Sequence, residues 1–116
     1  MNVAVDAPPR RFALVGAPNS GKTALFNALT GSRQKVGNYP GVTIERKAGA
    51  FETPSGHKVS LLNLPGTYSL RARSPDEEVT RDVVLGRLAG EVAPDLLIAV
   101  ADATNLRSAL RLVLEL

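Results

Sequence analysis

Residues 16–23 are the stretch that most constrains the fold of this chain, because they read Gly-Ala-Pro-Asn-Ser-Gly-Lys-Thr. The octapeptide fits the pattern G-x-x-x-x-G-K-[ST], in which a glycine-rich loop joins a strand to a helix. The apolar run 11–15 precedes it, and residues at helical spacing follow it as far as a glycine stop at Gly31. This order predicts a strand, a phosphate-binding loop and a helix. An ordinary glycine-rich turn is the competing interpretation, and these flanks disfavour it.

The positions of this loop, called the phosphate loop below, match what a triphosphate requires. Gly16 and Gly21 carry no Cβ, so the backbone can fold tightly and its amides can donate to phosphate oxygens. Lys22 would bring a positive charge to the β- and γ-phosphates, and the Thr23 hydroxyl would be a ligand for Mg²⁺. A helix that begins near Gly21 adds the positive end of its dipole. The expected nucleotide-contacting residues here are Gly16, Pro18, Asn19, Ser20, Gly21, Lys22, Thr23 and Ala24.

Composition narrows the class of protein. The chain has 116 residues, 44% of them hydrophobic, and no cysteine. This length suits one small domain with a single core, and the lack of cysteine excludes disulfides and thiolate metal sites. Its apolar runs are much shorter than the about 20 residues of a membrane span. The net charge of +3 comes from scattered residues, with few aromatic side chains to stack on bases, so no nucleic-acid partner is expected. Residues 1–10 are expected to be a flexible lead-in.

The middle of the chain predicts a loop and a hairpin. Residues 32–43 contain two glycines and a proline without sustained periodicity, which predicts a mobile loop. Residues 48–53 and 58–64 predict two antiparallel strands around the turn 54–56.

The remaining segments indicate the fold class. Ser74, followed by proline and three acids, predicts the start of a helix. The apolar run 95–102 predicts a buried parallel strand, and Thr104 or Asn105 would cap a further helix. We therefore expect an α/β fold of the P-loop NTPase type, a three-layer sandwich with helices on both faces. Its sheet would be mostly parallel, with one antiparallel hairpin strand.

Two further segments are typical of nucleotide hydrolases. Thr43 ends the predicted loop, where its hydroxyl and carbonyl could close onto Mg²⁺ and the γ-phosphate; a β-branched residue leading into a strand is the alternative. Residues 63–66, Asn-Leu-Pro-Gly, follow an apolar strand at the place where GTPases carry D-x-x-G. A simple Pro-Gly turn is the alternative there. Three signals in series favour nucleotide binding, which adds Gly41, Val42, Thr43, Asn63, Pro65 and Gly66 to the expected contacts.

These motifs together resemble the amino-terminal G domain of the FeoB family of bacterial ferrous-iron transporters. The similarity lies in 16–31, in 36–47 (Val-Gly-Asn-Tyr-Pro-Gly-Val-Thr-Ile-Glu-Arg-Lys), in 63–70 (Asn-Leu-Pro-Gly-Thr-Tyr-Ser-Leu) and in 102–106. The resemblance implies a domain that binds GTP and GDP with Mg²⁺ and hydrolyses GTP. It also implies a helical regulatory domain and a polytopic membrane domain as partners, at the cytoplasmic face of the bacterial inner membrane. The chain itself would then be soluble, and its homo-oligomerisation is left open.

The resemblance also implies what this chain lacks. The guanine-specifying N-x-x-D segment would follow Leu116, so 11–116 are expected to be the amino-terminal part of an incomplete G domain. Asn63 stands where the family has an aspartate near Mg²⁺. Asparagine offers a neutral oxygen, so we expect weaker Mg²⁺ binding, through a water, with nucleotide binding retained.

Catalysis of phosphoryl transfer mostly requires positioning and charge neutralisation, which Lys22 and the Mg²⁺ ligands would supply. Thr67 occupies the position of the water-orienting glutamine of Ras-like GTPases and is too short for that reach, so backbone groups near it would orient water. The resemblance implies that Asn19 helps to bind K⁺ where an arginine finger would otherwise reach, with Gly37 and Asn38 as further candidates. A turn residue is the alternative for Asn19.

Two other functions compete with this interpretation. A degenerate interaction module with little turnover is suggested by Asn63, and a ribosome-associated GTPase is suggested by the basic charge balance. His57, the single histidine, is expected to be an exposed turn residue. The acids 76–78 are expected to complement a helix N-terminus rather than to handle iron.

Overall fold

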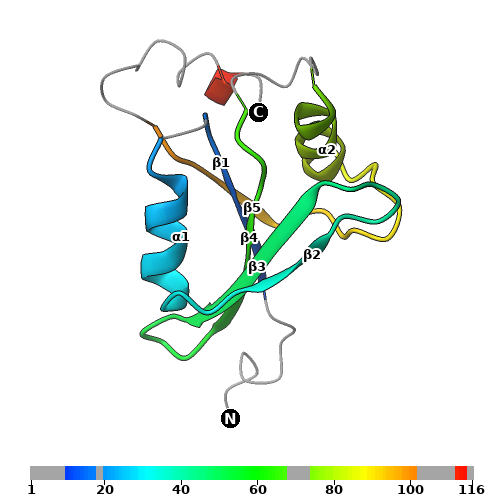
Figure 1. Cartoon of the computed structure of the whole chain (residues 1–116). Coiled ribbons are helices and arrows are strands. Elements are labelled where there is room, and N and C mark those ends of the chain that lie inside the picture. Colours follow the sequence, from blue (N-terminus) through cyan, green and yellow to red (C-terminus); the bar gives the residue numbers. More distant parts are fainter. Residues whose placement is uncertain (1–9, 18–19, 68–73, 102–111, 115–116) are drawn as a thin grey trace.

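The computed structural model describes residues 10–17, 20–67, 74–101 and 112–114, which form one sheet with helices on its faces (Figure 1). The elements in chain order are β1 (Arg10–Val15), α1 (Lys22–Thr30), β2 (Lys35–Asn38), β3 (Glu45–Glu52), β4 (Lys58–Asn63), α2 (Pro75–Val84) and β5 (Leu96–Ala99). β1 thus begins one residue earlier than the sequence pattern indicates. No helix in the described ranges is long and apolar enough to cross a bilayer.

The sheet has five strands in the order β2-β3-β4-β1-β5. β1 pairs in parallel with both β4 and β5, whereas β3 pairs antiparallel with both β2 and β4. Among the described strands, β3 alone therefore runs against the others. The mostly parallel sheet with one antiparallel hairpin strand is confirmed.

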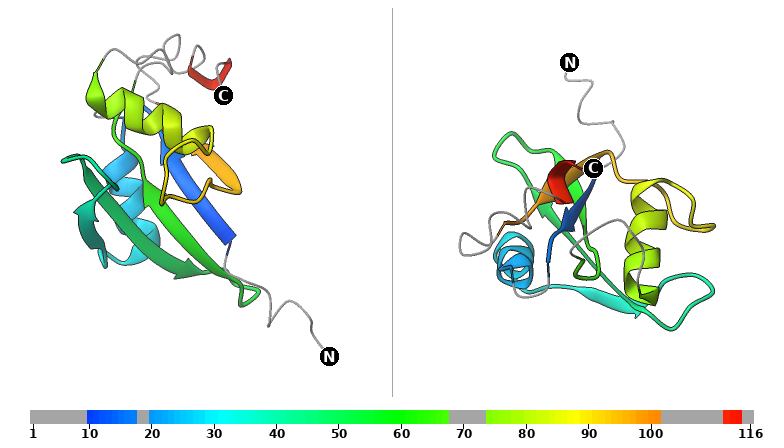
Figure 2. Two further views of the ribbon diagram at one scale, coloured as in Figure 1. Left: turned by 90° about the vertical axis from the view of Figure 1, so that its right-hand side faces the viewer. Right: turned by 90° about the horizontal axis from the view of Figure 1, so that it is seen from above.

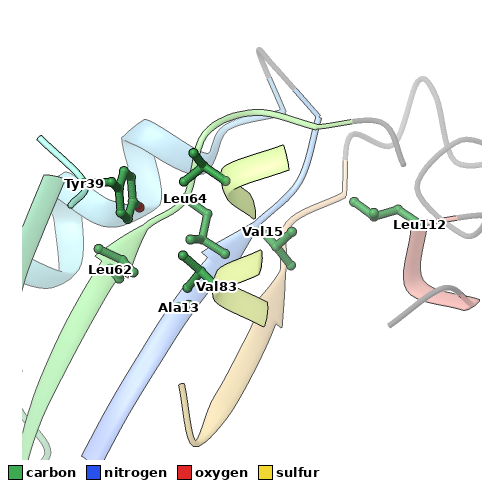
Figure 3. Packing of buried hydrophobic residues seen from close by; sticks show 8 residues of the cluster. Ala13, Val15, Tyr39, Leu62, Leu64, Val83 and Leu112 are labelled. Carbon is green, nitrogen blue, oxygen red and sulfur yellow. The ribbon is translucent and has the colours of Figure 1, made fainter. Parts of the chain in front are cut away.

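Helices α1 and α2 cover opposite faces of this sheet, and successive residues of β1 point alternately toward each of them (Figure 2). On one face, Phe26 of α1 packs with Leu14 and Leu61. On the other face lies the cluster to which α2 contributes (Figure 3). Its buried members are Ala13, Val15, Tyr39, Leu62, Leu64, Val79, Val83 and Leu112. The three-layer arrangement follows from this division of the core.

Local signals determine where both helices begin or end. Gly31 ends α1 in the left-handed conformation (φ 65°) and donates its amide to the Asn27 carbonyl. Ser74 caps α2, since its Oγ accepts from the Glu77 amide over 3.2 Å, and Pro75 is the first helical residue. The predicted starts of both helices are confirmed.

The prediction of a loop over 32–43 was wrong in part. Lys35–Asn38 form β2, which pairs with the first half of β3, and β3 begins at Glu45 instead of at residue 48. Every residue of β2 is exposed, so no alternation of apolar and polar side chains marks it as a strand. Its pairing depends on backbone hydrogen bonds to β3, which no local pattern shows.

The strand predicted over 95–102 is shorter and less buried than expected. β5 covers Leu96–Ala99, and Leu96 is 49% exposed. β5 lies at an edge of the described sheet and pairs with β1 alone among the described strands, so its side chains are covered only in part. A further helix is expected after Thr104 or Asn105; its predicted start lies outside the described residues, and residues 112–114 are helical.

Candidate nucleotide-binding site

The phosphate loop begins where β1 ends, at the edge of the sheet where the parallel strands have their carboxyl ends. The Leu64 amide donates to the Leu14 carbonyl over 3.1 Å, and the Thr67 amide donates to the Gly16 carbonyl over 2.8 Å. These bonds bring the segment after β4 beside the phosphate loop. Open α/β sheets bind ligands outside the carboxyl ends of their strands, so this edge is the expected place for a site.

Both glycines of the phosphate loop are required, Gly16 by its close neighbours and Gly21 by its backbone conformation. A Cβ on Gly16 would lie 2.6 Å from the Val100 carbonyl oxygen and 3.0 Å from Ser20 Oγ, too close for any side chain. Gly21 has φ +93°, which L side chains rarely adopt, and it immediately precedes α1. The loop is therefore tight where it leaves β1 and turns sharply into the helix.

Lys22, the first residue of α1, is the buried cation of the site. Its side chain is 8% exposed, and Nζ donates to Asn63 Oδ1 over 3.0 Å and to the Leu64 carbonyl over 2.7 Å. Burial, together with the positive charge of Lys47, lowers the pKa of the Lys22 ammonium. The ammonium thus donates to two neutral oxygens, and no carboxylate of the described residues is among its hydrogen-bond partners.

A cleft of about 230 Å³ opens beside this lysine and is called the phosphate cleft below. Its lining residues are Lys22, Thr23, Ile44, Glu45, Lys47, Asn63, Leu64, Pro65, Gly66 and Asp76. They come from four places: the start of α1, the start of β3 with the residue before it, the end of β4 with the segment after it, and the first turn of α2. The cleft therefore joins two of the three motifs that the sequence analysis singled out.

The phosphate loop has the chemistry that a phosphate group requires. Ser20 Oγ is buried and has no hydrogen-bond partner among the described residues, although buried polar groups nearly always have one. Lys22 supplies a positive charge, and the N-terminus of α1 supplies amides that have no partner within the helix. A bound anion would meet all three requirements at once.

The lining of the phosphate cleft also suits Mg²⁺ that is shared with a phosphate. Thr23, Glu45, Asn63 and Asp76 bring hydroxyl, carboxylate and amide oxygens, the donors that Mg²⁺ prefers. No group of three acidic or histidine residues in the described ranges could hold a metal by itself. The donors therefore fit an ion that completes its coordination with water and nucleotide oxygens.

Thr67 does not lie in the phosphate cleft, although it is one of the predicted catalytic residues. It is fully buried; Oγ1 donates to Glu77 Oε2 over 3.0 Å, and its amide contacts the Gly16 carbonyl. Thr80 Oγ1 donates to the Pro65 carbonyl over 3.2 Å. These bonds tie α2 to the segment after β4. In this arrangement Thr67 positions α2 against the phosphate loop.

Apart from Gly16, Ser20, Gly21 and Thr67, the predicted nucleotide-contacting and catalytic residues fall into three groups: those that line the phosphate cleft, those that are exposed outside it and those outside the described residues. The structure brings together Lys22, Thr23, Asn63, Pro65 and Gly66 around the phosphate cleft. Four of these residues are exposed and do not line this cleft: Ala24, Gly41, Val42 and Thr43. Pro18 and Asn19 lie outside the described residues.

Sequence reasoning missed three charged residues that line the cleft: Glu45, Lys47 and Asp76. The first two are two positions apart in β3, so they share one face of the strand, a signal that required the correct start of β3. Asp76 lies in the first turn of α2, and the sequence indicated for it only an interaction with the helix dipole.

Comparison with known proteins gives a consistent picture. Residues 10–116 match the family model described as ferrous iron transport protein B. The Fe(2+) transporter FeoB of Escherichia coli K12 is 52% identical over 105 residues, which cover 90% of this chain and 13% of the relative. FeoB of Methanocaldococcus jannaschii is 47% identical over the same share of this chain and 15% of its own length. The chain thus spans about an eighth of the curated relatives that it matches.

Solved structures show the same relationship. The crystal structure of the G domain of T. maritima FeoB superposes with a TM-score of 0.82 at 50% identity, covering 93% of this chain and 64% of that one. The cytosolic domain of the same protein in its GMPPNP form gives a TM-score of 0.81 at 48% identity, covering 90% of this chain and 39% of that one. The chain belongs to the FeoB family of ferrous-iron transport proteins and has the fold of that family's amino-terminal G domain.

Proposed function

We propose that this chain binds GTP and GDP together with Mg²⁺ in the phosphate cleft, and that the full-length protein hydrolyses GTP to regulate ferrous-iron transport. The observation that carries the proposal is the buried Lys22 ammonium at the junction of the phosphate loop and the segment after β4. Relatives described in GDP and GMPPNP forms support a guanine nucleotide as the ligand. Helical regulatory and membrane domains would be the partners, at the cytoplasmic face of the bacterial inner membrane.

The residues of the cleft would divide the work of binding. Lys22 would exchange its two neutral acceptors for β- and γ-phosphate oxygens, and the Ser20 hydroxyl would gain a partner. Thr23 would hold Mg²⁺, with Asn63 acting through a water. The metal, when bound, neutralises charge that develops on the transferred phosphoryl group. Thr43, which is exposed and outside the cleft in this structure, would reach the γ-phosphate by an ordering of residues 41–43 on binding.

Loss of the lysine tests the site. Lys22→Ala in the full-length protein should weaken binding of a fluorescent GTP analogue at least tenfold, because a charge-assisted contact of about 1.5–3 kcal/mol is lost. Lys58→Ala removes an exposed lysine of β4 that does not line the cleft and serves as the matched control. GTP should compete for the site better than ATP. Unchanged affinity in a folded Lys22→Ala protein would overturn the assignment.

Hydrolysis is proposed to depend on a monovalent cation. Thr67 is too short to replace a water-orienting glutamine, and its side chain is engaged by Glu77. An ordered K⁺ near Asn19 would supply positive charge beside the β–γ bridge. GTP turnover should therefore be faster in K⁺ than in Na⁺ at equal ionic strength, and Asn19→Ala should remove the difference while nucleotide affinity changes little. Equal turnover in the two salts would contradict this step.

A second candidate function is a nucleotide-binding interaction module with little turnover. Asn63 favours it, because its amide oxygen accepts from Lys22 and contributes no negative charge for Mg²⁺. Single-turnover measurements on the full-length protein separate the two. GTP that remains intact under Mg²⁺ and K⁺ while bound tightly would favour the module.

A further inference from the structure

Lys47 reaches the phosphate cleft from β3, a strand that neither of the cleft's sequence motifs includes. In the antiparallel pairing of β3 with β4, Lys47 lies directly opposite Asn63. Residues opposite each other in such a pair project from the same face of the sheet, with Cβ atoms about 5 Å apart. Lys47 and Lys22 both line the cleft, and Lys22 is hydrogen-bonded to the same Asn63.

The two lysines are close enough to repel each other. The charge of Lys47 contributes to the lowered pKa of Lys22, after burial. An aspartate at position 63, beside the Lys22 ammonium and opposite Lys47 in the strand pair, would offset the repulsion, but Asn63 carries no charge. The cleft therefore holds two cations near a neutral amide, with the carboxylates of Glu45 and Asp76 also in its lining, and a bound phosphate would reduce the repulsion between the two cations.

Lys47 is also held only weakly by the protein. Its Nζ lies 3.4 Å from Glu45 Oε1, and the two side chains are 38% and 57% exposed. Exposed ion pairs of this kind contribute little to stability, because water and salt screen them. The ammonium can therefore leave Glu45 for a stronger partner without much cost to the fold.

We propose that Lys47 is a second phosphate-binding cation of the cleft, and that Asn63 makes it available by not competing for its charge. This inference rests on the proposed nucleotide function. The Lys47 ammonium exchanges Glu45 for a terminal phosphate oxygen of the bound nucleotide, while Lys22 binds the β- and γ-phosphate oxygens. Lys47 thereby neutralises part of the phosphate charge. Mg²⁺ would neutralise that charge less well here, because position 63 offers it no carboxylate.

The test compares the affinities of GDP and a non-hydrolysable GTP analogue, with EDTA or with Mg²⁺, in the full-length protein. Lys47→Gln should weaken binding about fivefold in EDTA and less in Mg²⁺, because the metal then screens the same phosphates. Lys47→Arg keeps the charge and should stay within twofold of the native protein. Lys58→Gln, an exposed lysine on the neighbouring strand outside the cleft, is the matched control and should also stay within twofold. A Lys47→Gln protein that binds like Lys58→Gln overturns the proposal.

A separate measurement tests whether the residue at position 63 controls the availability of Lys47. In an Asn63→Asp background, the introduced carboxylate would pair with Lys47 across the two strands, so adding Lys47→Gln should change the EDTA affinity by less than twofold. An effect as large as in the native background overturns the proposed competition. If Lys47→Gln does not fold, Lys47→Thr carries the same test, since threonine suits a strand.

Failure of the inference can be distinguished from failure of the proposed function. Loss of binding in Lys22→Ala with no effect of Lys47→Gln would leave the nucleotide site intact and refute only the role of Lys47. Unchanged binding in Lys22→Ala would refute the nucleotide site itself.

Discussion

Tyr39 offers a sharp test of the packing around the cleft, because its hydroxyl is buried without a hydrogen-bond partner among the described residues. The side chain is 1% exposed and packs in the α2-side cluster with Leu62 and Leu64 (Figure 3). An unpaired buried hydroxyl costs about 1–3 kcal/mol. Tyr39→Phe keeps the ring and leaves almost no cavity, so we expect the free energy of unfolding to rise by about 1–2 kcal/mol.

The same substitution should change how stability depends on pH. Burial, reinforced by the negative charge of Glu91 and opposed by Arg46, raises the pKa of the Tyr39 hydroxyl above its ordinary value of 10.0. The neutral form is therefore favoured in the folded state. The corresponding stability is fully present below about pH 10 and is lost as the pH rises beyond it. Phenylalanine has no proton to lose, so the advantage of Tyr39→Phe should grow above that pH.

Urea denaturation of the isolated G domain at neutral and alkaline pH measures both effects; the G domain of the T. maritima relative crystallised by itself. An unchanged m-value would show that the substitution alters stability rather than the compactness of either state. A loss of about 1 kcal/mol or more at neutral pH would refute the reasoning, because it would mean that the hydroxyl makes a hydrogen bond in the folded protein.

Other substitutions test the remaining parts of the structure. Gly49→Val should lower the free energy of unfolding by about 1–3 kcal/mol in thermal denaturation, because a Cβ there would lie 2.6 Å from Thr30 Cγ2; unchanged stability would contradict the packing of α1 on β3. Ser74→Ala should cost about 1 kcal/mol in urea, since the hydroxyl accepts from the Glu77 amide at the start of α2. Asn63→Asp should tighten Mg²⁺-dependent nucleotide binding by restoring a negative charge near the cation, as followed by Mg²⁺ titration of nucleotide release; equal or weaker Mg²⁺ affinity would refute the view of Asn63 as a weakened metal residue.

Features that depend on neighbours in the chain could be predicted from the sequence. Three such features depend on backbone contacts between residues within one helical turn: the phosphate loop, the glycine that ends α1 and the serine–proline start of α2. The hairpin around 54–56 likewise follows from turn residues between two apolar runs. A strand, a phosphate loop and a helix in this order also suffice to indicate the fold class, because these three segments pack together in few ways.

Features that depend on distant pairing were decided only by the tertiary structure. β2 has no buried residue and exists because β3 supplies its hydrogen-bond partners. Lys47 enters the phosphate cleft because the register of β3 and β4 places it opposite Asn63, and a shift of one residue would turn it to the other face. The Thr67 hydroxyl donates to Glu77 on α2, a partner that no local pattern around Thr67 indicates. In each case the partner lies on another element, so the contact is determined by strand register and helix packing and not by the local sequence.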